Sequence, residues 1–271
     1  MTWSPARGEA LLHTLIAGEP ISIDSRFAHA ALCERRRRGD VDAMESKPYL
    51  PIISFCEEWL TRHGDNALGV GWPRDDAEVR YRVMLDLMRP SSSPVTLLDF
   101  GCGASHLYEY ILKNRMDRIS YSGLDLSERF LELSRRKFPA VVYHRVDVLD
   151  PATVSLPSFD YVVMNGIFTY RGALSQDDMF AYLCALVRRV SDMATIGFAF
   201  NVMTTQVDWE RDDLFHLPVD RLLTFLSREV SRHVVIRHDY GLYEYTAYVY
   251  KRSSIPEQDG AKSLVDGKGA P

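Results

Sequence analysis

A short apolar run that ends in an acid and is followed at once by two glycines constrains the fold of this chain most. Residues 95–98 are Val-Thr-Leu-Leu, Asp99 follows them, and Gly101 and Gly103 precede a helical apolar pattern from about Ala104. A short apolar run is typical of a buried parallel strand. Glycines directly after such a strand let the backbone turn tightly and approach a ligand closely. The segment therefore predicts a strand, a loop for a nucleotide-type cofactor and a helix.

The residues beside the glycines indicate the kind of cofactor. The dinucleotide fingerprint G-x-G-x-x-G needs a third glycine for close helix–strand packing, where this chain has the bulky His106. Asp99 would also face the two phosphates of a dinucleotide. Asp99-x-Gly101-x-Gly103 instead resembles motif I of the class I S-adenosylmethionine-dependent methyltransferases, acid-x-Gly-x-Gly-x-Gly, with Ser105 in place of the last glycine. Their cofactor has no phosphate and carries an ammonium and a sulfonium, which an acid can stabilise.

The resemblance implies that Asp99, Gly101, Gly103 and His106 belong to the cofactor loop. The alternative is an ordinary strand–turn–helix in which the glycines serve only the turn.

Three further segments follow in the order that such a site requires. Residues 120–125 predict a second strand that ends in Asp125, an acid placed to accept both ribose hydroxyls, and Leu126 is expected against the adenine. Residues 141–148 predict a third strand. The resemblance implies that its last two residues, Asp147 and Val148, contact the amino group and ring of the adenine.

Residues 158–168 predict a fourth strand with Asn165 and Gly166 at its mouth. In the family that this pattern resembles, backbone groups at this position meet the methionine portion of the cofactor. One acid after a strand is usually a turn residue, but four such positions after four successive strands indicate a binding site.

The order of predicted elements indicates an α/β fold. Strands and helices alternate from residue 95 to about 252, with helices over 177–190 and 219–227 and a fifth strand over 194–200. Two closing strands, 233–236 and 243–250, are joined by a hairpin-length connection and must be antiparallel. We therefore expect a seven-stranded, mostly parallel, doubly wound sheet with an antiparallel C-terminal hairpin.

We expect three parts along the chain. Residues 1–90 form a helical N-terminal extension, with helices over 49–60 and 77–88, and residues 91–252 form the S-adenosylmethionine-binding core. Residues 253–271, rich in Gly, Lys, Ser and Asp, form a disordered tail.

The segment between the two N-terminal helices, residues 63–73, contains three glycines, Asp65 and Trp72. We interpret it as a lid over the methyl-transfer site, with Asp65 orienting a polar acceptor and Trp72 stacking on it; a plain connecting loop is the alternative. The segments 63–72, 80–86, 197–201 and 238–245 resemble a bacterial subgroup of class I methyltransferases that is often encoded near surface-polysaccharide or secondary-metabolite genes. This resemblance covers roughly residues 47–252.

Methyl transfer to a hydroxyl or ammonium needs a positioned acceptor and gains from a nearby base. We expect His216, in the loop after the fifth strand, to be the base, and Tyr170 and Asn201 to contact the substrate. None of the eight histidines shows metal-ligand spacing, so no metal is expected, although the acids at 208, 212 and 213 leave metal-assisted O-methylation as an alternative.

Composition limits the partners. The net charge of −5 disfavours a nucleic-acid surface, and the basic run at residues 35–38 lies between acids. Four cysteines without C-x-x-C spacing, and the lack of a signal peptide or an 18-residue apolar window, predict a cytoplasmic protein outside the membrane. The oligomeric state is left open.

We therefore predict methyl transfer from S-adenosylmethionine to a small molecule, a sugar or a secondary metabolite, at oxygen or nitrogen. The alternatives are a nicotinamide-dependent oxidoreductase, which His106 and the closing hairpin disfavour, and a non-catalytic protein that keeps the cofactor fold.

Overall fold

The structure, a computed structural model, describes residues 47, 49–72, 74–153 and 156–253. The basic run at 35–38 and the predicted tail beyond Ser253 lie outside the described residues, so the expectations for them stay predictions. No helix in the described ranges has the length and apolar character needed to cross a membrane.

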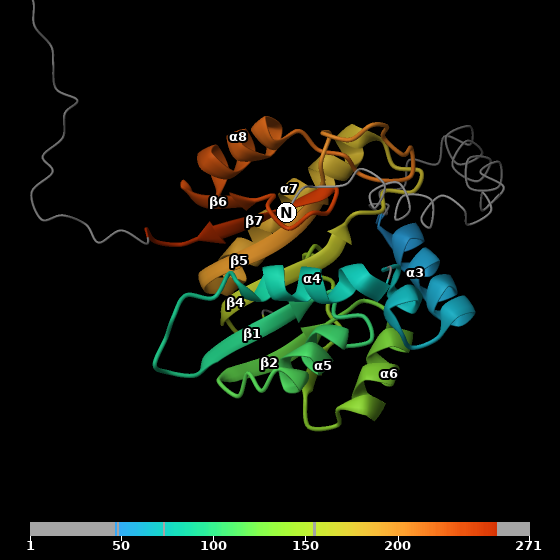
Figure 1. The fold of residues 1–271 in the computed structure, drawn as a ribbon, viewed down its shortest axis with the longest axis vertical. Coiled ribbons are helices and arrows are strands. Elements are labelled where there is room, and N and C mark those ends of the chain that lie inside the picture. Colours follow the sequence, from blue (N-terminus) through green and yellow to red (C-terminus); the bar gives the residue numbers. More distant parts are fainter. Residues whose placement is uncertain (1–46, 48, 73, 154–155, 254–271) are drawn as a thin grey trace, which may run out of the picture.

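A seven-stranded sheet in the order β3-β2-β1-β4-β5-β7-β6 forms the centre of the molecule (Figure 1). The first five strands pair in parallel, and β7 pairs antiparallel with both β5 and β6. This confirms the predicted sheet and its reversed C-terminal hairpin. The strands are β1 (Val95–Phe100), β2 (Ile119–Leu124), β3 (Val142–His144), β4 (Phe159–Phe168), β5 (Ala194–Met203), β6 (His233–Arg237) and β7 (Glu244–Tyr250).

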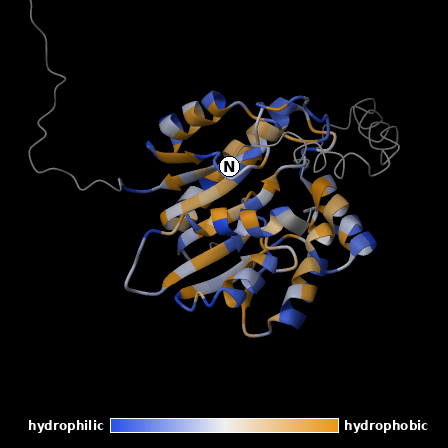
Figure 2. Cartoon of the chain, in the orientation of Figure 1, coloured by the Kyte–Doolittle hydropathy of each residue, from blue (hydrophilic) through white to orange (hydrophobic). Residues whose placement is uncertain are grey.

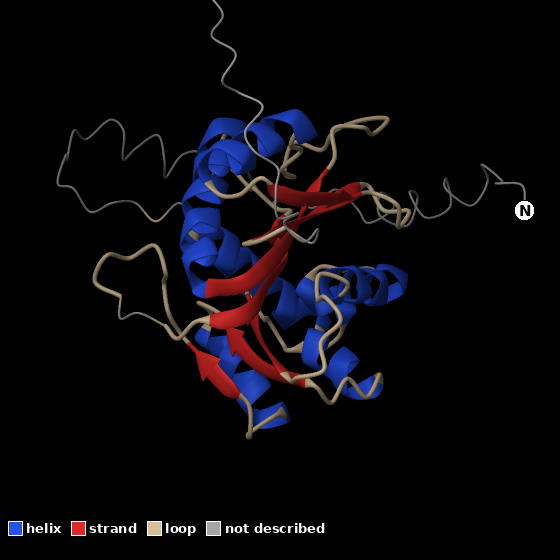
Figure 3. Cartoon of the chain, turned by 90° about the vertical axis from the view of Figure 1, so that its left-hand side faces the viewer, coloured by secondary structure: helices blue, strands red, loops and turns tan. Residues whose placement is uncertain are grey.

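Helices cover both faces of the sheet (Figure 3). Leucines, methionines and tyrosines of α4 and α5 pack with Leu97, Tyr161 and Val163 on one face, whereas α7 and α8 pack with Val162 and Met164 on the other. Alternate residues of β4 thus face opposite layers, as strand geometry requires. The helices are α3 (Leu50–His63), the short 3-10 helix η1 (Ala67–Val70), α4 (Arg74–Leu85), α5 (His106–Lys113), α6 (Glu128–Lys137), α7 (Gln176–Met193) and α8 (Val219–Glu229).

Apolar residues concentrate in the central strands and on the inner faces of the helices (Figure 2). All seven residues of β7 are buried, because it lies between β5 and β6 and beneath both helix layers. The third strand differs from the prediction of residues 141–148, because β3 is only three residues long. β4 agrees with the strand predicted over residues 158–168 and includes Asn165 and Gly166, with a register irregularity between Met164 and Phe168.

The strand order places the ligand crevice. It reverses direction between β1 and β4, and in open α/β sheets ligands bind outside the carboxyl ends of the strands at such a point. The loops after β1, β2, β3 and β4 therefore meet at one edge, and α3 with η1 lies across that edge (Figure 1).

Candidate cofactor site and its covering segment

The loop after β1 has a backbone conformation that would allow a ligand to approach closely. Gly101 and Gly103 have φ of +75° and +50°, in the left-handed region that favours glycine. A Cβ on Gly101 would lie 2.6 Å from Ile167 Cδ1. Ser105, which replaces the third glycine of the family pattern, also has a positive φ, of 59°. Its buried hydroxyl is hydrogen-bonded to Ser134 and Tyr143, which offsets the strain of that conformation.

Asp99, the last acid of β1, is buried and accepts a hydrogen bond of 2.8 Å from the Tyr121 hydroxyl. Burial raises the pKa of Asp99 to about 7, against the lowering effect of that hydrogen bond. A cation beside this carboxyl group would stabilise its ionised form, which burial disfavours.

Asp125 stands at the end of β2 and organises the cofactor loop. Its carboxylate accepts hydrogen bonds of 2.9 Å from the Gly103 amide and 2.9 Å from the Ser127 amide. Burial raises its pKa, and the backbone donors act in the opposite direction. Each carboxylate oxygen keeps a second lone pair, so the predicted contacts to two ribose hydroxyls remain available. Leu126, predicted beside the adenine, comes directly after it.

Asp147 follows β3 and is already engaged by the N-terminal segment. Lys47 Nζ lies 2.6 Å from its carboxylate, and the Tyr49 hydroxyl donates to the same oxygen. Burial alone would raise the pKa of Asp147, but the hydrogen bonds from Lys47 and Tyr49 lower it. An adenine amino group would therefore have to share this carboxylate. Val148, the other residue predicted there, is buried in the core.

Gly166 lies in the irregular part of β4 with φ of +84°. Its amide donates a hydrogen bond of 2.7 Å to Asn201 Oδ1, and Asn201 Nδ2 donates at 3.0 Å to Glu244. Asn201 has no exposed surface. The structure therefore corrects the expectation that Asn201 contacts substrate: its amide is used on both sides to hold the Gly166 turn.

The neighbouring Asn165 provides a test of whether a ligand fits here. Its Oδ1 is buried and has no hydrogen-bond partner. Buried polar atoms of this kind are uncommon in native structures and call for a partner. A cationic or donor group at the mouth of β4 would satisfy it, which agrees with the ammonium of the expected cofactor.

The segment before α4 covers this edge at several points. Glu57 on α3 is hydrogen-bonded by the Ser127 hydroxyl. A Cβ on Gly103 would lie 3.5 Å from Cγ1 of Val70 in η1, and a Cβ on Gly166 would lie 2.4 Å from Cζ2 of Trp72. The segment thus contacts the loops after β1 and β2 and the Gly166 turn. Trp72 packs on the Gly166 turn and under the Arg80 guanidinium, 4.1 Å from its ring centroid.

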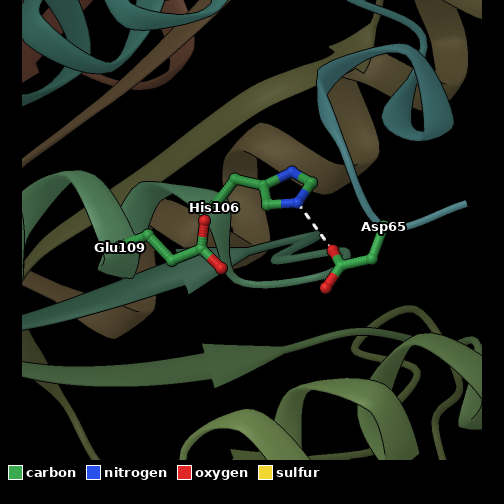
Figure 4. Close-up of side chains that lie close together, drawn as sticks. All are labelled: Asp65, His106 and Glu109. Carbon is green, nitrogen blue, oxygen red and sulfur yellow. Dashed lines mark hydrogen bonds and ion pairs between the residues drawn. The ribbon is translucent and has the colours of Figure 1, made fainter.

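Asp65 and His106 meet at the entrance of α5 (Figure 4). Asp65 Oδ1 lies 2.8 Å from His106 Nε2, and Lys137 Nζ lies 3.0 Å from the Asp65 carboxylate. These contacts tie the lid segment to α5 and α6. Asp65, predicted to orient the acceptor, therefore already has two protein partners, His106 and Lys137, in this arrangement.

Asp65, His106 and Glu109 also lie close enough together to suggest a metal site. Lys137 Nζ, however, lies 2.6 Å from Glu109 and bonds Asp65, so an ammonium already neutralises the cluster. We treat the cluster as an ion-pair network.

His216, predicted as the base, is buried with both ring nitrogens in use. Nδ1 lies 2.7 Å from the Thr204 carbonyl oxygen, which can only accept, so Nδ1 carries the proton. Nε2 then accepts from the Arg211 amide at 3.3 Å. Since neither nitrogen is left to take an acceptor's proton, we do not retain His216 as a catalytic base.

Tyr170 and α3 form an aromatic surface that the sequence analysis missed. The Tyr170 ring stacks on Phe55, with centroids 4.1 Å apart, and Phe55 in turn stacks on Trp59 at 5.6 Å. Trp59 Nε1 is buried without a partner. The four-residue spacing of Phe55, Trp59 and His63 on one helix was the available signal.

Comparisons with known proteins agree with this geometry. The family model for a methyltransferase domain matches residues 98–195. The Mycobacterium tuberculosis protein named "Putative methyltransferase Rv1506c" is 30% identical over 165 residues, which are 60% of this chain and 97% of that protein.

Two solved structures share the fold. The magnesium protoporphyrin IX methyltransferase ChlM from Synechocystis PCC 6803 with bound SAH matches with a TM-score of 0.51 and 11% identity over 75% of this chain and 97% of its own. The pyocyanin biosynthetic protein PhzM matches with a TM-score of 0.51 and 13% identity over 75% of this chain and 68% of its own.

Proposed function

The chain belongs to the class I S-adenosylmethionine-dependent methyltransferases, and we propose that its acceptor is a small molecule methylated at oxygen or nitrogen. Methyltransferase activity and the use of S-adenosylmethionine follow from the family. The family also removes the nicotinamide-dependent oxidoreductase from consideration. The acceptor class and the residues named below are the proposal.

One observation carries the assignment of the cofactor site. Asp99, Asp125, Asp147 and Gly166 lie near or just after the carboxyl ends of four neighbouring parallel strands, at the point where the strand order reverses. In the proposed arrangement, Asp125 holds the ribose hydroxyls and Asp147 the adenine amino group. Asp99, Asn165 and Gly166 then surround the methionine end.

The cofactor supplies an electrophilic methyl group on a sulfonium. The chain contributes by binding the cofactor, orienting the acceptor and excluding water. Gly101 and Gly103 allow close approach of the backbone. The covering segment, residues 49–72, closes the edge of the sheet and raises the effective concentration of a correctly aligned acceptor. Such positioning can account for most of the rate enhancement in an in-line displacement.

A small acceptor is supported by the charge and by the covering segment. The net charge of −5 disfavours binding to the phosphates of a nucleic acid. The aromatic rings of Phe55, Trp59 and Tyr170 lie beside the mouth of β4, and apolar walls with few polar groups are typical of small-molecule sites.

The direct experiment incubates the purified protein with S-adenosylmethionine and panels of sugars, phenols and amines, and measures S-adenosylhomocysteine and the methylated product by mass spectrometry. We expect turnover with one panel and none with oligonucleotides. Turnover only with nucleic acid or protein would contradict a small-molecule acceptor. The Tyr170→Ala variant should raise the acceptor KM more than the cofactor KM.

A further inference from the structure

A buried arginine outside the sheet, Arg80 on α4, is not used by the function proposed so far. Only 8% of its side chain is exposed. Its Nε donates a hydrogen bond of 3.0 Å to Glu244 on β7. Its Nη1 is buried without a hydrogen-bond partner and lies 3.6 Å from Oδ2 of Asp76, at ion-pair distance.

From Arg80, a chain of buried contacts leads to the turn at the end of β4. Glu244, 1% exposed, accepts from both Arg80 and Asn201. Asn201 then accepts the hydrogen bond of the Gly166 amide at 2.7 Å. Three side chains thus connect a helix of the N-terminal extension to one backbone amide of the candidate site.

A second route joins the same two points. The Arg80 guanidinium lies over the Trp72 ring at 4.1 Å, and the edge of that ring packs against Gly166. A cation over an indole face is attracted by the ring's charge distribution. Arg80 therefore contacts Trp72, which packs on the Gly166 turn. Through Glu244 it also supports Asn201, which accepts the hydrogen bond of the Gly166 amide.

Stability alone is a weak explanation for this arrangement. Burying an ion pair costs desolvation that its Coulombic attraction often fails to repay, and an unsatisfied buried N–H adds to the cost. The helix α4 also has other attachments. The hydroxyls of Tyr248 and Tyr250 donate to the carbonyls of Val83 and Leu87, and Met84 is buried in the core.

We propose that Arg80 is a positioning residue for methyl transfer, acting through Glu244 and Asn201 on the Gly166 amide and through Trp72 on the cover of the same turn. The proposal rests on the function proposed above, in which the Gly166 turn meets the methionine end of the cofactor. Through Arg80, Glu244 and Asn201, the position of α4 affects the conformation of the Gly166 turn.

The test compares Arg80→Met, Arg80→Lys and Glu244→Gln with Glu78→Gln. Glu78 is a matched control because it lies on the same helix and makes an exposed ion pair with Lys113. Binding of S-adenosylhomocysteine is measured by calorimetry, turnover by product formation, and Trp72 fluorescence by difference from Trp72→Phe. Circular dichroism and thermal melting establish that each variant is folded.

We expect Arg80→Met to stay folded, to weaken S-adenosylhomocysteine binding about 10-fold or more, and to change the Trp72 signal on binding. Arg80→Lys should recover part of the loss, since an ammonium can still donate to Glu244. Glu78→Gln should match the wild type. Wild-type affinity, turnover and Trp72 signal in folded Arg80→Met would overturn the proposal.

Should Arg80→Met not fold, Glu244→Gln decides by the same criteria, because it keeps the size of the side chain and one acceptor oxygen, removes the charge, and can no longer accept from both Arg80 and Asn201. A wild-type protein that does not bind S-adenosylhomocysteine would instead refute the proposed cofactor site. The two failures are therefore distinguishable.

Discussion

At the scale of single residues, Asp99 couples the cofactor site to pH. Burial raises its pKa to about 7 in the ligand-free protein, so the folded state holds a proton that the unfolded chain has released. The contribution of Asp99 to stability is therefore largest below the ordinary carboxyl pKa and is lost as the pH rises through about 7. A cofactor ammonium beside Asp99 would favour the ionised form.

We expect the affinity for S-adenosylhomocysteine to increase as the pH rises toward 7 and to level off above about 7, because binding expels the Asp99 proton at lower pH. Calorimetry in two buffers of different ionisation enthalpy measures this proton release. Asp99→Asn should remove that part of the pH dependence. The same slope in the variant would assign the proton to another group.

Gly166 permits a second prediction at this scale. A Cβ there would lie 2.4 Å from Trp72 at a φ of +84°, whereas a Cβ on Gly241, at +78°, would meet nothing within 4 Å. Both Gly→Ala changes incur about 1–2 kcal/mol of backbone strain. Gly166→Ala should lose about 1–3 kcal/mol more by overpacking, and cofactor affinity with it.

Denaturant unfolding of the two variants measures the difference. Trp72→Ala in the Gly166→Ala background should restore part of the stability. Equal losses at Gly166 and Gly241 would show that Trp72 does not press on the turn.

Residue types near strand ends were predictable because the signal is local: an apolar run, an acid and glycines. The roles of Asn201 and His216 were not. Their partners, Gly166 and Glu244 for one and Thr204 and Arg211 for the other, are fixed by loop and strand packing that the sequence pattern does not encode. A polar residue near the site looks the same in sequence whether it faces the ligand or the backbone.

At the scale of elements, α3 has a single buried residue, Leu60. Leu60, buried with Ala104 and Phe130, is its main apolar anchor, whereas Leu50 on the same helix is 51% exposed. Few buried contacts make an element open more readily than the core.

Leu60→Ala should therefore destabilise the closed position of α3 by about 2–3 kcal/mol and raise the KM for S-adenosylmethionine. Limited proteolysis should cut residues 50–72 faster in this variant. Leu50→Ala is the matched control and should behave as wild type. Equal protection of both variants would mean that α3 does not depend on this anchor.

Helical periodicity predicted α3, α4, α7 and α8 to within a few residues, because each has a continuous apolar stripe. The extent of β4 was also predicted, as residues 158–168 against the observed Phe159–Phe168, but its irregularity was not. The positive φ of Gly166 lets the strand continue through a shift in register to the buried Phe168, and no sequence pattern shows that shift.

At the scale of the whole molecule, the N-terminal extension and the sheet share one core. Val83, Met84 and Leu87 are buried with strand residues, and the Tyr161 hydroxyl accepts from the Arg89 amide. The residues on both sides of the boundary proposed at residue 90 therefore belong to the same hydrophobic core. Alternating patterns reveal which strands and helices exist, whereas the sharing of a core depends on tertiary contacts.

A chain that begins at Ser91 should consequently fail to fold, since the sheet face now covered by α4 would be exposed to water. Circular dichroism and the cooperativity of thermal melting measure this. A cooperative transition at the wild-type temperature would show that the core of residues 91–252 is independent.

The central claim is that the strand-end acids hold S-adenosylmethionine, and Asp125 tests it most directly. Titration of S-adenosylhomocysteine into wild-type protein and Asp125→Ala by calorimetry should show tight binding to the first. The variant should lose on the order of 2–4 kcal/mol, about 30- to 1,000-fold, through lost charge-assisted hydrogen bonds to the ribose. An unchanged affinity in the folded variant would contradict the account.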